Sequence, residues 1–187
     1  PYHIDFKDYG MMLINTNVSH TLVEAEYNDR RQVCEKIATL LHVDFLRDAT
    51  EKTLKQIETK ITSVEYQKAL YVIQENERVL KAAKAIEQHR LDVFGKLLFQ
   101  AHHGARHQFK ISCPELDYLV EQAKNKLPVI GARMMGGGFG GCTINIVHLD
   151  AMKSYEKDIS EAYHQKFGKH CSIYHVNLSQ GTHLIKN

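Results

Sequence analysis

The pattern of apolar and polar positions places short strands near both ends of the chain and a long helical region between the first two of them. Four short apolar runs have the length and composition of buried strands. They are residues 9–14, 129–134, 143–148 and 171–176. Because helices follow one another and strands cluster near the ends, this order favours an α+β fold over a strictly alternating α/β sheet.

Five longer segments repeat apolar residues every three or four positions, which indicates helices with one buried face. They are residues 21–41, 66–89, 91–103, 113–124 and 151–167. In the longest helix, five apolar side chains are candidate core positions. They are Leu70, Ile73, Val79, Leu80 and Ile86. The alternating charges over residues 51–60 predict a further helix that faces water.

Three of these helices carry recognisable start signals. Thr21 with Glu24, and Ser112 with Glu115, have the spacing of capping boxes, in which a hydroxyl and a carboxylate bind the free amides of the first turn. Asp150 is a candidate N-cap for the helix over 151–167.

Composition and charge exclude several classes of protein. The 187 residues suffice for one domain with a sizeable core or for two small packed lobes. With 43% hydrophobic and 25% charged residues the chain resembles ordinary soluble globular proteins. A net charge of +2 gives no support for a nucleic-acid surface. No apolar run reaches the roughly 18 residues of a membrane span, and the first residues lack the features of a signal peptide.

Neither the cysteines nor the histidines have the spacing of a metal site. The four cysteines lie far apart without a C-x-x-C pair, which indicates reduced thiols in a cytoplasmic protein. They are Cys34, Cys113, Cys142 and Cys171. His102, His103 and His107 form a cluster, but no H-E-x-x-H glutamate accompanies it, so a solvated helix end is the preferred interpretation and no metal is predicted.

The most informative segment is a glycine cluster between the second and third predicted strands. Five of its six residues are glycines, at a large cost in chain entropy if they served only as a connection. They are Gly136, Gly137, Gly138, Gly140 and Gly141. Such a turn lets a ligand approach the backbone, and successive amides can form a concave anion site. Phe139 is expected to anchor the loop, and a tight turn packed beneath another element remains the alternative.

Two familiar uses of a G-x-G-x-x-G pattern do not fit its surroundings. A dinucleotide site needs a helix directly after the loop, whereas residues 143–148 form a predicted strand. A protein-kinase phosphate loop lies between strands, but neither H-R-D nor D-F-G follows it here.

Three segments in order along the chain resemble the galactokinases of the GHMP kinase superfamily. The glycine cluster lies in G-A-R-M-M-G-G-G-F-G-G-C-T at 131–143, which is similar to a conserved motif of that family. The sequence N-T-N-V-S-H-T-L at 15–22, followed by E-Y-N-D-R-R at 26–31, resembles the segment that follows the first lobe. S-C-P-E-L-D at 112–117 is similar to the start of a family helix.

This resemblance implies a fold, an activity and a set of site residues. The fold is a ferredoxin-like lobe, an antiparallel sheet covered by helices, and residues 1–187 form the C-terminal lobe of a two-lobed sugar kinase. The activity is transfer of the γ-phosphoryl group of ATP to the C1 hydroxyl of galactose, with Mg²⁺. Tyr27 takes the position of a tyrosine that contacts the sugar, and Gly136 to Gly141 form a loop against the substrate and phosphate.

The resemblance also implies what this segment does not supply. The family's sugar-binding R-x-N-L-I-G-E-H-x-D-Y segment, its ATP loop and its catalytic aspartate do not occur in the sequence. We therefore assign no catalytic residue and expect the chain to be inactive without an N-terminal lobe, which is its expected partner. Two alternatives stay open: an N-acetylgalactosamine kinase, and a non-catalytic galactose sensor or transcriptional co-regulator on the same scaffold.

Overall fold

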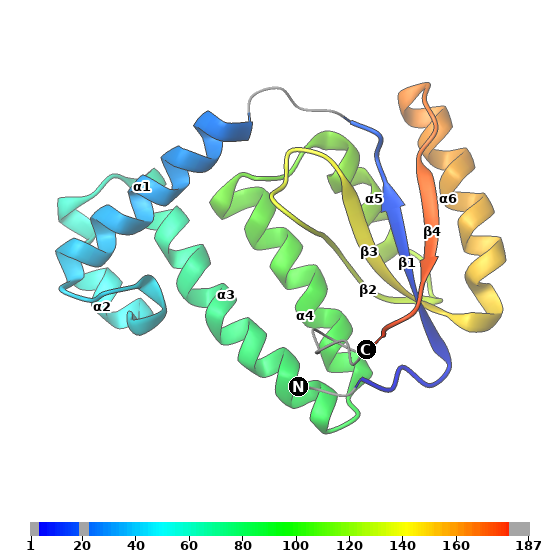
Figure 1. Ribbon diagram of the computed structural model, residues 1–187, viewed down its shortest axis with the longest axis horizontal. Helices are drawn as coiled ribbons and strands as arrows, with labels where there is room; N and C mark the ends of the chain where they lie inside the picture. The colour runs from blue at the N-terminus through cyan, green and yellow to red at the C-terminus, as the bar shows by residue number, and fades with distance from the viewer. Residues whose placement is uncertain (1–3, 19–22, 180–187) are drawn as a thin grey trace, which may run out of the picture.

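A computed structural model describes residues 4–18 and 23–179 (Figure 1). Its centre is a four-stranded sheet in the order β2-β3-β1-β4, and all neighbouring strands are antiparallel. The strands are β1 (Tyr9–Asn15), β2 (Val129–Met134), β3 (Cys142–His148) and β4 (Ser172–Val176). Helices separate β1 from β2 and β3 from β4, while β2 and β3 form a hairpin. This is the ferredoxin-like arrangement, so the α+β prediction is confirmed.

Within residues 4–18 and 23–179, six helices and several short turns accompany the strands, close to the segments predicted from periodicity. The helices are α1 (Val23–Leu41), α2 (Glu51–Gln56), α3 (Ser63–Glu87), α4 (Leu91–Gly104), α5 (Pro114–Lys124) and α6 (Met152–Phe167). A π-helical turn, Ala105–Phe109, extends α4. Short 3₁₀ turns lie at Leu46–Asp48, Glu58–Lys60 and Leu149–Ala151.

One face of the sheet is covered by α5 and α6, as the alternation of its side chains requires. Met12 and Ile14 of β1 are fully buried in a core that also contains Leu119 of α5 and Ile159 of α6. Tyr163 is buried in the same core, and its hydroxyl donates a hydrogen bond to the carbonyl of Thr16 at 2.8 Å. The polar end of this tyrosine is thereby satisfied where β1 ends.

A second core joins α1, α2 and α3 at the end of the molecule away from the sheet (Figure 1). Ile37, Leu54 and Ile73 are buried in it, in agreement with the predicted core face of α3. The prediction is wrong for Val79 and Leu80, which are 59% and 70% exposed. The reason is tertiary, because the second half of α3 runs beyond α1 and α2 and loses the neighbours that cover its first half (Figure 1).

Helices α5 and α6 each begin one residue after the predicted start, but their predicted caps are wrong. The N-cap of α5 is Cys113, without a side-chain cap bond; Ser112 instead donates to Asp117 at 2.6 Å, and Glu115 pairs with a lysine. Asp150 is not the N-cap of α6, because it lies within the 3₁₀ turn that precedes the helix. The proposed cap at Thr21 lies outside the described residues.

An additional capping box opens α3. The side chain of Thr62 accepts the amide of Glu65 at 3.2 Å, and the Glu65 carboxylate accepts the amide of Thr62 at 2.9 Å. Both bonds satisfy amides that the first turn leaves without helical partners. Thr62 and Glu65 lie before the predicted start of this helix at 66, so its periodicity placed the start three residues late.

Helix α4 lies against the edge strand β2 through two glycines. A Cβ atom on Gly95 would lie 2.0 Å from the carbonyl oxygen of Ile130, and one on Gly131 would lie 2.5 Å from the Cα of Gly95. The backbones therefore touch at a distance that no side chain permits. This contact holds β2 in place directly before the glycine cluster.

Two further expectations concern the described residues alone. All four cysteines are free thiols, as predicted. Among residues 4–18 and 23–179, no helix is both long enough and apolar enough to cross a lipid bilayer.

Candidate functional site

An open cleft separates α1 from the loop between β2 and β3. Its volume is about 380 Å³. Four residues of α1 line one side, and the loop, the end of the π-helical turn and Ile111 line the other. They are Tyr27, Arg30, Arg31, Cys34, Phe109, Ile111, Gly136, Gly137 and Phe139. Tyr27 and the start of the glycine cluster, more than 100 positions apart in the sequence, thus meet at one cleft.

The sheet holds both ends of the glycine loop. The amide of Met135 donates to the carbonyl of Cys142 at 3.0 Å and closes the hairpin. The carbonyl of Gly141 accepts two hydrogen bonds from Thr16, one from its amide and one from its hydroxyl, each at 2.9 Å. Because Thr16 is fully buried at the end of β1, the loop leaves the sheet from a fixed base.

The middle of the loop is anchored from below. The amide of Phe139 donates to the carbonyl of Ile111 at 2.7 Å, so this residue holds the loop through its backbone. Its half-buried side chain lines the cleft and is not part of a hydrophobic core of the described residues, which differs from the expected anchor. Gly138 has φ +90° and lies so close that a Cβ atom would be 2.1 Å from the same carbonyl oxygen. At this position glycine serves close packing, which was the alternative interpretation of the cluster.

The start of the loop is open. Gly136 and Gly137 are exposed, and apart from the adjacent residues of the chain no heavy atom lies within 4 Å of the place where a Cβ atom would be. Both line the cleft, whereas Gly138, Gly140 and Gly141 are outside its lining and shape the loop behind it. The peptide groups at 136 and 137 are therefore accessible to a ligand.

Arg30 joins the two sides of the cleft, a role that the sequence analysis missed. Its side chain is buried, and it donates to the carbonyls of Phe109 at 2.9 Å and Lys110 at 2.7 Å. It also pairs with the carboxylate of Glu26, and its guanidinium lies 5.0 Å from the ring centre of Phe139. A planar cation with five donors suits this site better than a lysine. Its position in the E-Y-N-D-R-R segment was the only available signal.

The accessible side chains of the cleft can bind and orient a ligand. Tyr27 is 62% exposed, so its hydroxyl is available for a hydrogen bond. The hydrogen bond from Arg31 to Glu35 raises the pKa of this guanidinium, which stays positively charged. Burial raises the pKa of the Cys34 thiol, which is therefore neutral at physiological pH and a poor nucleophile.

The S-C-P-E-L-D segment supports the loop from the other side of β2. Asp117 accepts hydrogen bonds from Ser112 at 2.6 Å and His102 at 3.2 Å, and pairs with Arg106 at 3.0 Å. Burial alone would raise the pKa of Asp117, but these three partners outweigh it and lower the value. His102 also accepts the amide of Met134 at 3.2 Å, so α4, α5 and the end of β2 share one network.

This network corrects part of the histidine prediction. His102 is 4% exposed and has a structural role in this hydrogen-bond network, because its two ring nitrogens bond to partners on β2 and α5. His103 and His107 are exposed at the end of the helix, as predicted. In the part of the chain that the structure describes, no three His, Cys, Asp or Glu residues are placed to hold a metal ion.

Comparison with known proteins relates this geometry to one superfamily. The family model of the C-terminal region of GHMP kinases matches residues 82–165. Galactokinase of Thermosipho africanus is 37% identical over 98% of this chain and 51% of its own length. Galactokinase of Mannheimia succiniciproducens is 38% identical over 94% of this chain and 46% of its own length. The chain thus spans about half the length of the curated relatives it matches.

Solved structures agree with the sequence comparison. The crystal structure of Lactococcus lactis galactokinase complexed with galactose superposes with a TM-score of 0.85 at 30% identity, and the match covers 92% of this chain and 46% of that one. Mevalonate kinase of L. major, at 18% identity and a TM-score of 0.55, shares the fold. The chain therefore belongs to the GHMP kinases, as a C-terminal domain similar to that of galactokinases.

Proposed function

We propose that the complete protein is a galactokinase, which transfers the γ-phosphoryl group of ATP to the C1 hydroxyl of galactose. This chain contributes the wall of the active site that holds the sugar. The observation that carries the proposal is the cleft itself, where the exposed Tyr27 faces Gly136 and Gly137. The similarity to a galactokinase crystallised with galactose supports the same assignment.

Each part of the cleft has a distinct role in this proposal. The Tyr27 hydroxyl forms a hydrogen bond with the sugar, and the peptide groups at Gly136 and Gly137 lie against the sugar and the transferred phosphate. Gly138, Gly140 and Gly141 complete the loop, and the hydrogen bond from the amide of Phe139 to Ile111 holds the loop in position. Phosphoryl transfer depends mainly on positioning and on neutralising charge, which a backbone cradle on a rigid base serves.

ATP and Mg²⁺ are expected cofactors of the complete protein. The open loop fits an anionic phosphate, because its peptide groups are unobstructed at 136 and 137. No carboxylate lines the cleft at Tyr27, and Mg²⁺ in proteins is bound through carboxylate oxygens, water and substrate phosphates. We therefore assign Mg²⁺ and the catalytic base to the partner lobe, and expect this chain alone to be inactive.

The test is an assay of ADP formation by the complete protein with galactose, N-acetylgalactosamine and glucose. Turnover of galactose is the expected result, and a preference for N-acetylgalactosamine would favour that kinase instead. Saturable galactose binding without turnover would point to a sensor. Turnover by residues 1–187 alone would contradict the assignment of the catalytic groups to a partner lobe.

Tyr27→Phe tests the sugar contact itself. Loss of one hydrogen bond of about 1.4 kcal/mol raises the KM for galactose roughly tenfold and leaves the KM for ATP almost unchanged. Tyr174→Phe is the matched control, because Tyr174 on β4 is 51% exposed and lies outside the cleft. Equal effects of the two substitutions on the KM for galactose would exclude a role of Tyr27 in sugar binding.

A further inference from the structure

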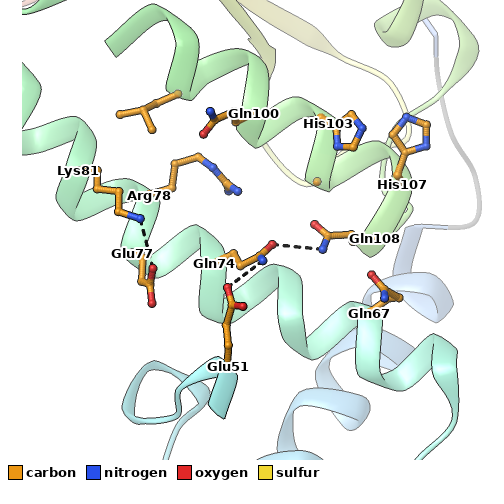
Figure 2. A pocket seen from close by; sticks show the side chains of 12 residues that line it. Glu51, Gln67, Gln74, Glu77, Arg78, Lys81, Gln100, His103, His107 and Gln108 are labelled. Atoms are coloured by element: carbon orange, nitrogen blue, oxygen red, sulfur yellow. Dashed lines mark hydrogen bonds and ion pairs between the residues drawn. The ribbon is translucent and has the colours of Figure 1, made fainter. Parts of the chain in front are cut away.

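A second and larger groove lies between α3 and α4 (Figure 2). Its volume is about 670 Å³, and residues of α2, α3, α4 and the π-helical turn line it. It shares no lining residue with the cleft at Tyr27. Its volume falls in the range of roughly 300–1,000 Å³ that is typical of sites for small molecules.

Four glutamines give this groove its chemistry. Gln74 donates to the carboxylate of Glu51 at 2.9 Å and accepts a hydrogen bond from the amide nitrogen of Gln108 at 3.2 Å (Figure 2). These two hydrogen bonds hold the side-chain amides of Gln74 and Gln108 in a fixed orientation. Gln67 and Gln100 form no hydrogen bond with any described residue, so their donors and acceptors are available to a ligand. Each amide offers two donors and an acceptor oxygen.

The charges of the groove are balanced. Arg78 pairs with Glu75 on the same helix, and Lys81 lies 3.4 Å from Glu77. Glu51 and Glu77 offset the positive charges of Arg78 and Lys81 within the lining. An anion would therefore gain no net attraction here, which distinguishes this groove from a phosphate site.

Two imidazoles and one aliphatic side chain complete the lining. The rings of His103 and His107 lie 4.5 Å apart at one end of the groove (Figure 2). Partial burial of His107, and then its electrostatic interactions with His103 and Arg106, lower the pKa of this histidine. The ring is therefore neutral at pH 7, with one donor and one acceptor nitrogen. Leu97 adds an apolar side chain to the lining.

We propose that this groove binds a neutral polyhydroxylated molecule, a mono- or disaccharide, at a site separate from Tyr27. Vicinal hydroxyls both donate and accept hydrogen bonds, as do the amides of Gln67, Gln74, Gln100 and Gln108. The balanced charges favour an uncharged ligand over a sugar phosphate. The inference rests on the groove alone and does not depend on the proposed kinase activity.

The test measures binding of lactose, maltose and glucose to the complete protein by saturation-transfer NMR. A Tyr27→Ala background removes the expected contribution of the first cleft. Saturable binding of at least one sugar is expected there, with a signal at least fivefold weaker after Gln100→Leu. Gln165→Leu on α6 is the matched control, because it is an exposed helical glutamine outside the groove.

Gln100→Leu removes no hydrogen bond to another described residue, so the fold is expected to persist, with an unchanged unfolding midpoint as the check. If this variant did not fold, Gln67→Leu would serve instead, because Gln67 is also exposed and has no partner among the described residues. Absence of saturable sugar binding in the Tyr27→Ala background would overturn the proposal. So would binding that both glutamine variants leave unchanged, or displacement of the sugar by inorganic phosphate at equal concentration. Kinase assays do not enter any of these outcomes.

Discussion

Glycines serve opposite purposes in two neighbouring regions of the molecule, the contact of α4 with β2 and the loop that follows β2. At the contact, Gly95 and Gly131 allow two backbones to touch, and a Cβ atom on either would overlap main-chain atoms of the other segment. In the loop, Gly136 and Gly137 have empty space around them. The first pair is required by packing and the second leaves the backbone open to a ligand.

Glycines of a single cluster therefore differ in role from one position to the next. Gly138 lies in the same loop, yet its close approach to Ile111 makes it resemble Gly95 more than Gly137. Substitutions at these positions therefore separate stability from activity.

Gly95→Ala is expected to lower the free energy of unfolding by about 3 kcal/mol, because the new methyl group meets the backbone of Ile130, which cannot move without displacing β2. Denaturant unfolding of the variant measures the loss. Gly137→Ala is the control at an open position and is expected to change stability by about 0.5 kcal/mol or less. Equal stability of the two variants would break the comparison.

Gly137→Val is expected to reduce kcat/KM for galactose phosphorylation by the complete protein roughly 100-fold, since a branched side chain in the cleft displaces the substrate. The fold persists, because no atom lies within 4 Å of the new Cβ. Steady-state kinetics together with the unfolding midpoint check both parts. Unchanged kinetics would return the loop to a purely structural role.

Arg30→Lys is expected to have an intermediate effect on stability, because Arg30 connects the loop to α1. A lysine cannot replace the fork that binds the carbonyls of Phe109 and Lys110, and we expect a loss of about 2 kcal/mol in the free energy of unfolding. Arg31→Lys is the matched control at an exposed neighbour, with an expected change near zero. A similar loss in both variants would remove the bridging role from Arg30.

Glu65→Gln, remote from both glycine regions, gives the smallest effect. Hydrogen bonds from Lys36 and then from the Thr62 amide lower the pKa of Glu65 from 4.5 to about 2. Because folding lowers the pKa of Glu65, its ionised carboxylate stabilises the folded state at pH values above the unfolded pKa near 4.5. This contribution to the free energy of unfolding disappears as the pH falls towards 2. At pH 7 the variant is expected to lose about 0.5–1 kcal/mol.

Unfolding of the wild type and of Glu65→Gln at pH 7 and at pH 2 checks the sign. The difference in unfolding free energy between the two proteins is expected to shrink at the lower pH. A difference that stays constant between these values, or grows on acidification, would contradict the assigned direction of the pKa shift.

Much of the architecture could be predicted from local patterns. The four strands follow from short apolar runs and the long helices from periodicity, because burial of one face imposes a repeat on the sequence. The alternating charges after residue 50 predicted a water-facing helix, but the segment divides into a helix and a 3₁₀ turn, and Leu54 and Ile57 are buried. Periodicity wrongly predicted Val79 and Leu80 as core residues, since an apolar residue on a helix is buried only if another element covers it. The capping box predicted at Ser112 is also absent, because the Ser112 hydroxyl donates to the carboxylate of Asp117 and does not bind a backbone amide of the first turn.

The candidate site was predictable only in part. The glycine cluster was visible because five glycines in six residues are unusual, and the resemblance to a family drew attention to Tyr27. Arg30, His102 and the contact between Gly95 and Gly131 were not recognised, because their roles come from partners on other elements. The groove between α3 and α4 was equally hidden, since its glutamines lie on three separate elements.

By itself, the sequence determined the order and type of the elements, the α+β class and the segments that resemble a GHMP kinase domain; the ferredoxin-like type was implied only by that resemblance. These depend on local periodicity, glycine content and short motifs, which can be read along the chain. The tertiary structure decided which glycines are packed and which are open, and it placed Tyr27 opposite the loop. The physical reason is that contacts between residues far apart in sequence exist only after the chain has folded and excluded water between them.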